Sequence, residues 1–582
     1  MRQLSPQAKA LARSFDYVDI ETDGFNPSVI WCASVCRDNE VKHYLDADSF
    51  NGYLRETDRI IVFHNGHKFD IPILQRLWGS DFSGKPVLDT LVLSMLANPS
   101  RDGGHSLRAW GERLGFPKGE HEDWSQLSPQ MLDYCAQDTR VTAALHYALQ
   151  KELAHTGQQA IDLEHRVAYI IGEQERNGWE FDLPHACMLL AEISEKVYDL
   201  ETTLVQSCGL LTKPGKKVTP KYKKDGSLSV VGVRDIIESG ASVSGEFSRI
   251  HTCSLNPNSR VQLGDWLIRK GWKPTALTPT GKPVIDEGSM AKCPIPEAKL
   301  IHQYFLLNKK KAMVAKWIEE VSDSGRIHGR VRTIGAVTGR MTHSDPNLAQ
   351  VPSVRSEYGR ECRECFTVPE GKVLVGTDAS SLELVCLAHY MGDDNYSKEV
   401  ESGNAHTINQ EAAGLDTRDQ AKTFIYAFLY GAGDEKIGTI VGGGAAEGAR
   451  LKQRFLSRTP SLRKLRQRVD SAARRGWLMG LDGRQIHVRS AHAALNSLLQ
   501  SAGAVIMKQA LVLLYDEVKL RGLNAIPVGN IHDEYQWEVA ENDAEEFAKP
   551  SVRAIEEAGV VLGLRCNVTG EAKIGRNWAD TH

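Results

Sequence analysis

The sequence lacks a hydrophobic run long enough to cross a membrane, and its N-terminus has no signal-peptide core. It also lacks paired cysteine motifs. The 11 cysteines are scattered, and the CxxC at Cys362 and Cys365 has no second pair to complete a zinc site. We therefore expect reduced thiols in a cytosol-like compartment, no membrane association, and a CxxC that is coincidental.

A strong excess of one charge is also absent, because the formal net charge is −4. This balance neither indicates nor excludes a nucleic-acid partner, since binding depends on local patches. One such patch is strongly basic: residues 450–475 carry ten Arg and Lys against the single acid Asp470. At 582 residues, with 41% hydrophobic and 25% charged residues, the chain is typical of a globular protein with several domains.

Residues 417–433 contain no proline and end in glycines, which predicts a helix of about four turns. A stripe of two cations and two phenols recurs every four residues along one face, at Arg418, Lys422, Tyr426 and Tyr430. Such a stripe suits a ligand with a polyphosphate at one end and a ring or sugar at the other. Taken alone, an amphipathic helix with snorkelling Arg and Lys side chains explains the spacing equally well.

Residues 15–45 predict three short strands, FDYVDIE, SVIWCASVC and VKHYL. Asp19 and Glu21 are two residues apart, so both carboxylates leave the same face of the first strand, an arrangement that indicates a divalent metal. The apolar strand IIVFHN leads to Asp70 at a helix start, and the helical segment MLDYCAQDTRVTAAL places Tyr134 one turn before Asp138. Each acid alone is typical of a cap or a surface charge, but their order and context together indicate a site.

The segments DIET, HNGHKFD and YCAQD resemble the three motifs of the proofreading 3′→5′ exonucleases of the DEDDy group. The resemblance implies a ribonuclease-H-like fold in which two metal ions are bound by four carboxylates: Asp19, Glu21, Asp70 and Asp138. It also implies that Tyr134 orients the attacking water. The chemistry fits, because two cations beside a phosphodiester can activate water and stabilise the leaving oxygen.

Residues 161–208 predict two helices, the first ending at Asn177 and Gly178 and the second running from Pro184 to Gly209. The stretch that follows, to about residue 252, is rich in Lys, Gly and Pro and has weak periodicity, which predicts an exposed basic insertion, either a loop or a small subdomain. Helical patterns return at 259–272 and 297–321. The lysines at 309–311 fit either a solvated face or a DNA-backbone contact.

Two further carboxylates are expected at strand ends. GKVLVGTDASSLELVCLAH predicts a buried strand ending at Asp378 and then a helix, and LNAIPVGNIHDEYQWEV predicts two apolar strands around a tight turn near Asp533 and Glu534. An ionised Asp at the end of an apolar strand is costly unless it is paired or coordinated. If these strands share a sheet, the acids can hold two Mg²⁺ ions beneath a nucleotide whose phosphates meet Arg418 and Lys422.

The segments GTDASSLELVCLAH, TRDQAKTFIYAFLYGAG and NIHDEYQWEV resemble motifs A, B and C of the family A (Pol I-type) DNA polymerases, and the resemblance covers almost the whole chain. Within that family, the segments RDQAKTFIYAFLYGAGDEKIG and VFHNGHKFD resemble most the sequences of the replicative polymerases of T-seven-type podophages. It implies an α/β multidomain fold, a ribonuclease-H-like 3′→5′ exonuclease domain followed by a right-hand polymerase domain. The implied boundaries are 1–154 for the exonuclease, 155–330 for the thumb with a basic insertion at about 211–252, 331–395 for the first part of the palm, 396–495 for the fingers and 496–582 for the second part of the palm.

The same resemblance implies which groups bind metal and triphosphate. Asp378, Asp533 and the backbone carbonyl of Ala379 would bind two Mg²⁺ ions, and two more would occupy the exonuclease site, with Mn²⁺ able to substitute. The triphosphate would be held by three side chains: Arg418, Lys422 and His406. Charge that grows on the leaving pyrophosphate would be stabilised there.

Further roles are implied for nucleotide selection and DNA binding. Tyr426 would lie against the incoming sugar and base, and Glu383, hydrogen-bonded to Tyr430, would block a ribose 2′-OH. Glu534 is given only a supporting role. The implied DNA contacts are Arg340 and Gln500 on the minor-groove side of the primer–template and His532 near the primer end.

These expectations describe a replicative DNA-directed DNA polymerase with intrinsic proofreading, acting on primer–template DNA and dNTPs in the cytoplasm (of an infected bacterium if phage-encoded). A helicase–primase and a single-strand-binding protein are the implied partners. The insertion is shorter than the segment that recruits thioredoxin in the phage enzymes, which argues against that partner. It leaves a solvated loop, a DNA clamp element, or a dock for a clamp partner other than thioredoxin. The alternatives are a nuclease whose polymerase half only grips DNA, and a scaffold with dead sites; the presence of Asp378, Asp533 and Lys422 disfavours both.

Overall fold

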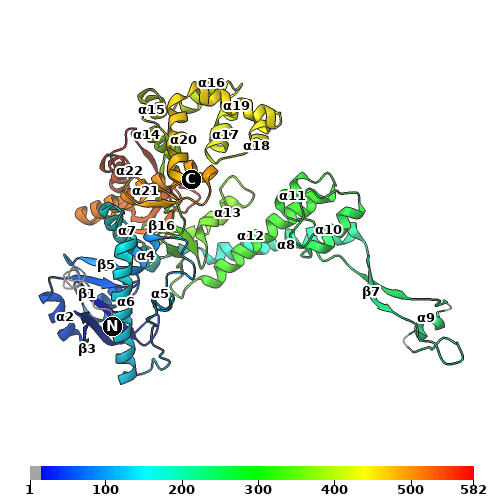
Figure 1. The fold of residues 1–582 in the computed structure, drawn as a ribbon, viewed down its shortest axis with the longest axis horizontal. Coiled ribbons are helices and arrows are strands. Elements are labelled where there is room, and N and C mark those ends of the chain that lie inside the picture. The colour runs from blue at the N-terminus through cyan, green and yellow to red at the C-terminus, as the bar shows by residue number, and fades with distance from the viewer. Residues whose placement is uncertain (1–14, 232, 240–241) are drawn as a thin grey trace. The chain divides into compact units, whose positions relative to one another are not determined.

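The computed structural model describes residues 15–231, 233–239 and 242–582. The chain (Figure 1) divides into two compact units. Each unit buries apolar side chains of its own. One unit is Leu183–Glu319, and the other combines the segments that precede and follow it. The five domain boundaries given above remain predictions.

The N-terminal region is built on a five-stranded sheet with the order β3-β2-β1-β4-β5. Its strands are β1 (Phe15–Thr22), β2 (Ile30–Arg37), β3 (Glu40–Tyr44), β4 (Ile60–Phe63) and β5 (Val87–Asp89). β1 pairs antiparallel with β2 and parallel with β4, so the sheet is mixed. Val18 and Ile20 of β1 enter the apolar core, and the alternate residues Asp19 and Glu21 leave the other face. The strands predicted over residues 15–45 are confirmed.

Helices pack around this sheet: α2 (Ala47–Glu56), α3 (Asp70–Trp78), α4 (Thr90–Ala97), α5 (Leu107–Leu114) and α6 (Pro129–Glu152). α6 lies against β1 and β2. It begins where the Ser128 side chain accepts the N–H of Met131 and where Pro129 takes the first helical position. The predicted helix start at Asp70 and the predicted helical segment around Tyr134 are confirmed.

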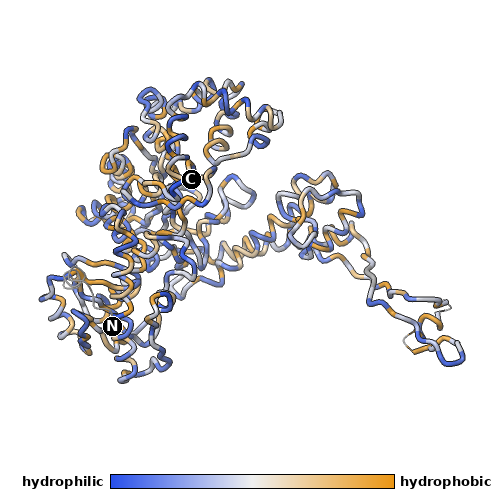
Figure 2. The backbone as a smooth tube through the Cα atoms, viewed as in Figure 1, coloured by the Kyte–Doolittle hydropathy of each residue, from blue (hydrophilic) through white to orange (hydrophobic). Residues whose placement is uncertain are grey.

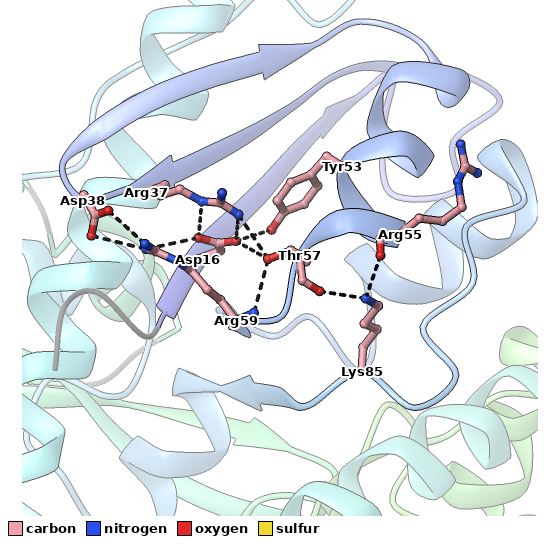
Figure 3. A network of polar contacts seen from close by, with 8 residues as sticks. All are labelled: Asp16, Arg37, Asp38, Tyr53, Arg55, Thr57, Arg59 and Lys85. Carbon is pink, nitrogen blue, oxygen red and sulfur yellow. Dashed lines mark hydrogen bonds and ion pairs between the residues drawn. The ribbon is translucent and has the colours of Figure 1, made fainter. Parts of the chain in front are cut away.

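A third acid of β1, Asp16, lies on the opposite face from the two predicted metal ligands and is fully buried in a polar network (Figure 3). Its carboxylate accepts hydrogen bonds from Arg37 (2.9 and 2.6 Å), Tyr53 (3.0 Å) and Thr57 (2.8 Å). A buried carboxylate is tolerated when it is paired and hydrogen-bonded in this way. Asp16 therefore fastens β1 to β2 and to the end of α2.

The C-terminal region contains a four-stranded antiparallel sheet with the order β16-β17-β13-β18. Its strands are β13 (Lys372–Ala379), β16 (Ala525–Ile531), β17 (Glu534–Ala540) and β18 (Gly570–Gly575). α22 (Ala544–Val561) packs on β13, β18 and the long α21 (Ala494–Arg521), which also contacts α14 (Leu382–Met391). The expectation that no run is long enough to cross a membrane is wrong for Ala491–Arg521, which is long and apolar enough by length and composition; 78% of its apolar window is buried, as in a core helix.

Between α14 and α21 lies a helical region with α15 (Asp394–Glu401), α16 (Ala405–Ala413), α17 (Arg418–Leu429), α18 (Asp434–Gly438), α19 (Ala445–Arg458), α20 (Pro460–Ala473) and the hairpin β14 (Trp477–Met479) and β15 (Gln485–His487). α17 begins with a capping box between Thr417 and Gln420. It ends before Gly431, whose φ is +73° and where a Cβ atom would lie 2.7 Å from the carbonyl oxygen of His492. The helix predicted over 417–433 is confirmed, and the basic patch lies on α19 and α20.

α7 (Gln158–Asn177) packs on α21 and β16 and carries a buried ionic cluster. The Glu164 carboxylate accepts hydrogen bonds from Lys508 of α21 at 2.6 and 2.8 Å and lies 2.7 Å from Arg484, which is bonded to Asp482 at 2.6 Å. Burial, partly offset by Glu164, lowers the pKa of Lys508 to about 8. The cluster joins the helix that follows the N-terminal region to the C-terminal core.

Short elements complete this unit: β6 (Trp179–Phe181), β9 (Arg326–Ile327) and β12 (Phe366–Thr367) form a small sheet, β10 (Arg330–Arg332) pairs with β11 (Thr342–Ser344), and α13 (Gly359–Glu364) precedes β12. The rings of Trp179, Phe366 and Trp578 pack together around the small sheet, with centroids 5.0–5.6 Å apart. The thiols of Cys362 and Cys365 are both buried.

The unit Leu183–Glu319 contains α8 (Leu183–Cys208), α10 (Arg260–Arg269), α11 (Glu287–Lys292) and α12 (Glu297–Glu320). α8 and α12 are joined by a hydrogen bond of 2.8 Å from the Tyr304 hydroxyl to Glu201. The predicted end of the preceding helix at Asn177, the helix that starts near Pro184, and the helices at 259–272 and 297–321 are confirmed.

The basic insertion is an extended ribbon of β7 (Leu211–Val218) and β8 (Phe247–Cys253), with the short helix α9 (Arg234–Glu238) between them. Ion pairs from Lys217 to Glu246 (2.9 Å) and from Arg249 to Asp235 (2.5 Å) brace it. Hydrophobic and strongly hydrophilic residues both occur in its distal part (Figure 2). The prediction of an exposed basic insertion is confirmed, but its strands were missed, because a ribbon with few buried positions has no alternation of apolar and polar residues.

Candidate active sites

Asp378 and Asp533 meet at one end of the C-terminal sheet. Asp378 is the penultimate residue of β13 and pairs in register with Glu534 of β17. The backbone N–H of Ala379 donates to the carbonyl oxygen of Asp533 at 3.1 Å. His532, with a φ of +56°, and Asp533 form the tight turn between β16 and β17. The predicted turn is confirmed, and the two carboxylates come from adjacent strands.

The charges at this end of the sheet repel one another. One side of Asp378 is exposed, yet burial of the remainder, followed by repulsion from Glu534 and Asp533, raises its pKa to about 6. The Arg340 guanidinium lies 3.4 Å from Asp533 and offsets part of this charge. Neighbouring carboxylates in this arrangement are stabilised by a divalent cation.

Glu534 is less available than the two aspartates. It is buried, accepts a hydrogen bond from the indole N–H of Trp578 at 2.9 Å, and lies 2.8 Å from the His582 ring. These contacts hold its carboxylate toward the C-terminal segment, which fits a supporting role.

A polar cavity of about 280 Å³ lies beside the first half of α17. Arg418, Lys422 and His406 line it, together with the acid Asp419. Burial, followed by repulsion from Arg418 and Lys422, lowers the pKa of His406, whose buried Nδ1 has no hydrogen-bond partner among the residues that the structure describes. Arg418 donates to the carbonyl oxygen of Gly403 at 3.3 Å. Two cations and an imidazole around one cavity suit a phosphorylated ligand.

The two phenols of the α17 stripe connect this helix to α14. The Tyr430 hydroxyl donates to Glu383 Oε1 at 2.8 Å, the contact that the resemblance implies. Tyr426 and Tyr430 stack with ring centroids 6.4 Å apart, and Tyr426 lies 6.2 Å from the His406 ring. The stripe therefore runs from the cationic cavity to the helix that directly follows Asp378.

Of the three residues predicted to contact DNA, Arg340 and His532 lie near Asp533. Arg340, which follows Gly339 in the turn between β10 and β11, lines a small cavity together with His532 and with Ala504 of α21. Gln500 lies one turn before Ala504 on the same helix and is partly exposed. Arg340 and His532 therefore lie beside Asp533, and Gln500 lies on the helix that helps to line the same cavity.

The four acids of the N-terminal region form a second cluster. Asp19 and Glu21 lie on β1, Asp70 begins α3, and Asp138 lies on α6. Burial raises the pKa of Asp19 to about 6, and burial followed by repulsion from Asp19 raises that of Glu21 to about 11 and that of Asp138 to about 7. The pKa of Asp70 is raised for the same two reasons. Carboxylates that resist ionising together are well suited to bind divalent cations.

Sequence reasoning missed Lys118, which lies in the loop before α6. Its ammonium forms an ion pair with Asp138 and lies 4.7 Å from the centroid of the Tyr134 ring. Burial would lower the pKa of Lys118, but attraction to Asp138 and Asp19 outweighs burial and raises it. Gln137 fixes the loop by donating to the carbonyl oxygen of Pro117 at 2.9 Å. No local pattern marks a lysine whose partners are on other elements.

Two further neighbours of the acids were missed. Asp89 accepts backbone N–H groups of Asn65 (2.8 Å) and Leu91 (2.9 Å) and so orders the segment before Asp70. Cys135, beside Tyr134 on α6, is fully buried with its sulfur 3.6 Å from Asp19 Oδ2. The motif spacing gave no reason to single out either residue.

Comparisons with known proteins find relatives that cover most of the chain. The family model for DNA polymerase family A matches residues 235–580. The DNA-directed DNA polymerases of Enterobacteria phage T3 and Escherichia phage T7 are each 35% identical to this chain; the alignments cover 94% and 90% of this chain and 96% and 92% of those proteins. The POL domain of Pol1 from M. smegmatis, in complex with DNA primer-template and dNTP, has a TM-score of 0.76 at 19% identity, covering 100% of this chain and 99% of that one.

Proposed function

We propose that Asp378 and Asp533 form the nucleotidyl-transfer site of this chain, which belongs to DNA polymerase family A and is a DNA-directed DNA polymerase. We also propose that its four N-terminal acids form a proofreading exonuclease site. The observation that carries the proposal is the position of the cationic stripe of α17. Its cavity and its tyrosine–glutamate contact lie beside the strand end that holds Asp378. The reaction would extend a DNA primer 5′→3′ on a template.

Divalent metal fits the palm acids, because their donors are carboxylate and carbonyl oxygens that repel one another. Asp378, Asp533 and the Ala379 carbonyl would hold two Mg²⁺ ions, with Mn²⁺ as a substitute. When bound, the ions would polarise the primer 3′-hydroxyl and offset charge on the leaving pyrophosphate. Arg418 and Lys422 would bind the triphosphate through the cavity that they line.

The rest of the stripe would bind the nucleoside. Tyr426 lies between the cationic cavity and Tyr430, so its ring would pack against the sugar and base. The Glu383 carboxylate, held by the Tyr430 hydroxyl at 2.8 Å, would occupy the space that a ribose 2′-OH requires. Arg340, Gln500 and His532 would contact the primer–template and its end.

The N-terminal cluster would remove mispaired nucleotides from the 3′ end. Asp19, Glu21, Asp70 and Asp138 fit divalent metal, because they are four converging carboxylates with raised pKa values. Two ions held there would activate water and stabilise the leaving 3′-oxygen. Tyr134, positioned beside Lys118 on the face of Asp138, would orient that water.

We extend the same proposal to location and partners. The relatives from phages T3 and T7 support action in a bacterial cytoplasm, and the solved relative with DNA primer-template and dNTP supports those ligands for this chain. A helicase–primase and a single-strand-binding protein are the proposed partners in replication.

Separation of the two activities tests the proposal. Asp378→Ala or Asp533→Ala should abolish primer extension but leave degradation of single-stranded ends, and Asp19→Ala combined with Glu21→Ala should do the reverse. The exposed Glu370→Ala is a matched control that should change neither activity. Extension by the palm variants at near wild-type rates would show that the acids are misassigned, and degradation that survives the N-terminal double change would remove the exonuclease assignment.

A further inference from the structure

One face of α20 carries a row of cations that the two proposed sites do not use. The other face is apolar, with Leu462, Leu465 and Val469 buried in the core. With about 3.6 residues per turn, the residues opposite these three face the solvent. Five cations lie there, all exposed, and form what we call the basic face of α20: Arg463, Lys464, Arg468 and, at the end of the helix, Arg474 and Arg475.

The charges of the basic face are not neutralised by neighbouring acids. Among the residues that the structure describes, none of the five cations forms an ion pair with a carboxylate, and Asp470, the single acid of this basic segment, forms none either. The preceding helix differs, because Arg450 of α19 pairs with Glu447, and Lys452 pairs with Asp434 at 2.9 Å. Neighbouring cations on one helix face repel one another, so a bound polyanion would stabilise this surface.

The surroundings of the basic face connect it with an aromatic ring and with the palm. The Arg475 guanidinium lies 5.3 Å from the centroid of the Trp477 ring, which is partly exposed on β14. Arg468 donates to the carbonyl oxygen of Tyr390 at 2.7 Å, near the end of α14. Since α14 begins four residues after Asp378 and is about 15 Å long, the basic face lies about one helix length beyond that acid.

This combination is suited to an unpaired nucleic-acid strand. Arginine, which supplies four of the five cations, binds phosphate oxygens through two parallel N–H groups. Proteins that hold single-stranded nucleic acid without sequence preference combine a cationic track with aromatic rings on which bases stack. An acidic peptide would use the cations but not the ring. A DNA polymerase meets an unpaired strand in every substrate, because the template continues beyond the primer end.

We propose that the basic face of α20, together with Trp477, binds the unpaired template strand beyond the primer end. The cations contact successive phosphates and the Trp477 ring stacks on one base, so the interaction is independent of sequence and sensitive to salt. Binding of the strand stands on α20 and β14 alone. Only the direction of the strand, from the palm toward α20, rests on the transfer site proposed at Asp378.

Affinity for the overhang tests the proposal. The full chain is titrated, without divalent ions or dNTP, with two DNAs that share one duplex and have template overhangs of about 2 or about 20 nucleotides. Losing three phosphate contacts, at about 0.7 each, should make the slope of log affinity against log salt shallower by about 2 for the long overhang. Affinity for it should fall at least about tenfold near 0.1 M salt, and affinity for the short overhang should change less than about twofold. The variant combines Arg463→Ser, Lys464→Ser and Arg474→Ser.

Two further variants separate this role from a general effect of charge. Trp477→Leu should weaken binding of the long overhang at least about fivefold, the loss of one stacked base, and should leave the salt slope unchanged. The matched control removes three exposed cations from β3, α2 and α6 and should bind both DNAs as the wild type does. It combines Lys42→Ser, Arg55→Ser and Lys151→Ser.

Several results would overturn the proposal. The wild type could bind the long overhang no more tightly than the short one, or the α20 variant could lose equal affinity for both. The control variant could lose as much as the α20 variant. A polyglutamate peptide that displaces the long overhang at equal charge concentration, with no effect of Trp477→Leu, would show that the surface binds acidic peptides instead. Because neither metal nor nucleotide is present, these results do not depend on the palm variants, which test the proposed function separately.

Discussion

Removing one charge from the buried ionic cluster should strongly destabilise the protein. Glu164 is fully buried and neutralises Lys508, with hydrogen bonds of 2.6 and 2.8 Å, and also Arg484 at 2.7 Å. Glu164→Gln keeps the side-chain volume but removes the charge. Arg484 keeps Asp482, bonded at 2.6 Å, whereas Lys508 loses the carboxylate that its ammonium contacts.

The loss of unfolding free energy in Glu164→Gln follows from the ammonium of Lys508, which remains buried without its partner. Its pKa is already lowered to about 8 by burial, so without Glu164 the ammonium gives up its proton at neutral pH. With a folded pKa of about 8 against about 10.4 unfolded, the wild type already carries about 3 kcal/mol of this penalty at pH 7.5, and complete discharge raises it by about 1 kcal/mol. The hydrogen bonds that Glu164 makes to Lys508 and its ion pair with Arg484 are lost as well, and removal of one partner of a buried ion pair typically costs about 3–5 kcal/mol in total.

Urea denaturation measures the difference in unfolding free energy between the wild type and Glu164→Gln. The pH dependence of that difference is an internal check. In Glu164→Gln the folded pKa of Lys508 lies below the unfolded value, so the folded state binds fewer protons and its stability rises with pH up to about 10. The wild type should show a smaller rise. Adding Lys508→Met should recover stability by removing the stranded ammonium, and Asp516→Asn, which breaks the exposed pair with Arg166, should cost below about 1 kcal/mol. A loss below about 1 kcal/mol for Glu164→Gln, or one that does not change with pH, would refute this reasoning.

Three other predictions concern the proposed sites. Tyr426→Phe should discriminate against dideoxynucleotides more strongly than the wild type, because the phenol can partly replace the missing 3′-hydroxyl; equal incorporation ratios would remove this role. Replacing residues 211–252 with a Gly/Ser linker should shorten products made in a single DNA encounter and barely change single-nucleotide insertion, and thioredoxin added to the intact protein should have little effect on product length; unaltered product lengths for the linker variant would leave the ribbon without a clamp role. Without divalent ions, stability should fall as pH rises from about 5 to about 8, since the folded pKa values of Asp19 and Asp138, about 6 and about 7, exceed unfolded values near 4. Mg²⁺ should restore the melting temperature at pH 8, and a response that persists in Asp19→Ala with Glu21→Ala would contradict the assignment.

Local sequence patterns were sufficient to predict the elements that we propose carry the polymerase chemistry. A spacing of four residues places side chains on one face of a helix independently of the rest of the chain, as for Arg418, Lys422, Tyr426 and Tyr430. The bounds of α17 are also local, because Thr417 caps its start and Gly431 follows its end. The period of two along β1 likewise places Asp19 and Glu21 on one face, and the turn at Asp533 follows from the two apolar strands beside it.

Contacts between distant segments were decided only by the tertiary structure. Lys118 reaches Asp138 from a loop with no pattern of its own, Cys135 meets Asp19 across 116 residues, and Glu164 meets Lys508 across 344. The strands of the basic ribbon belong here too, because cross-strand pairing rather than burial defines them. Sequence periodicity predicts which face of a helix or strand a residue occupies. Which other element covers that face depends on tertiary packing. The packing in turn sets the burial and the neighbouring charges of each site, and hence its metal preference.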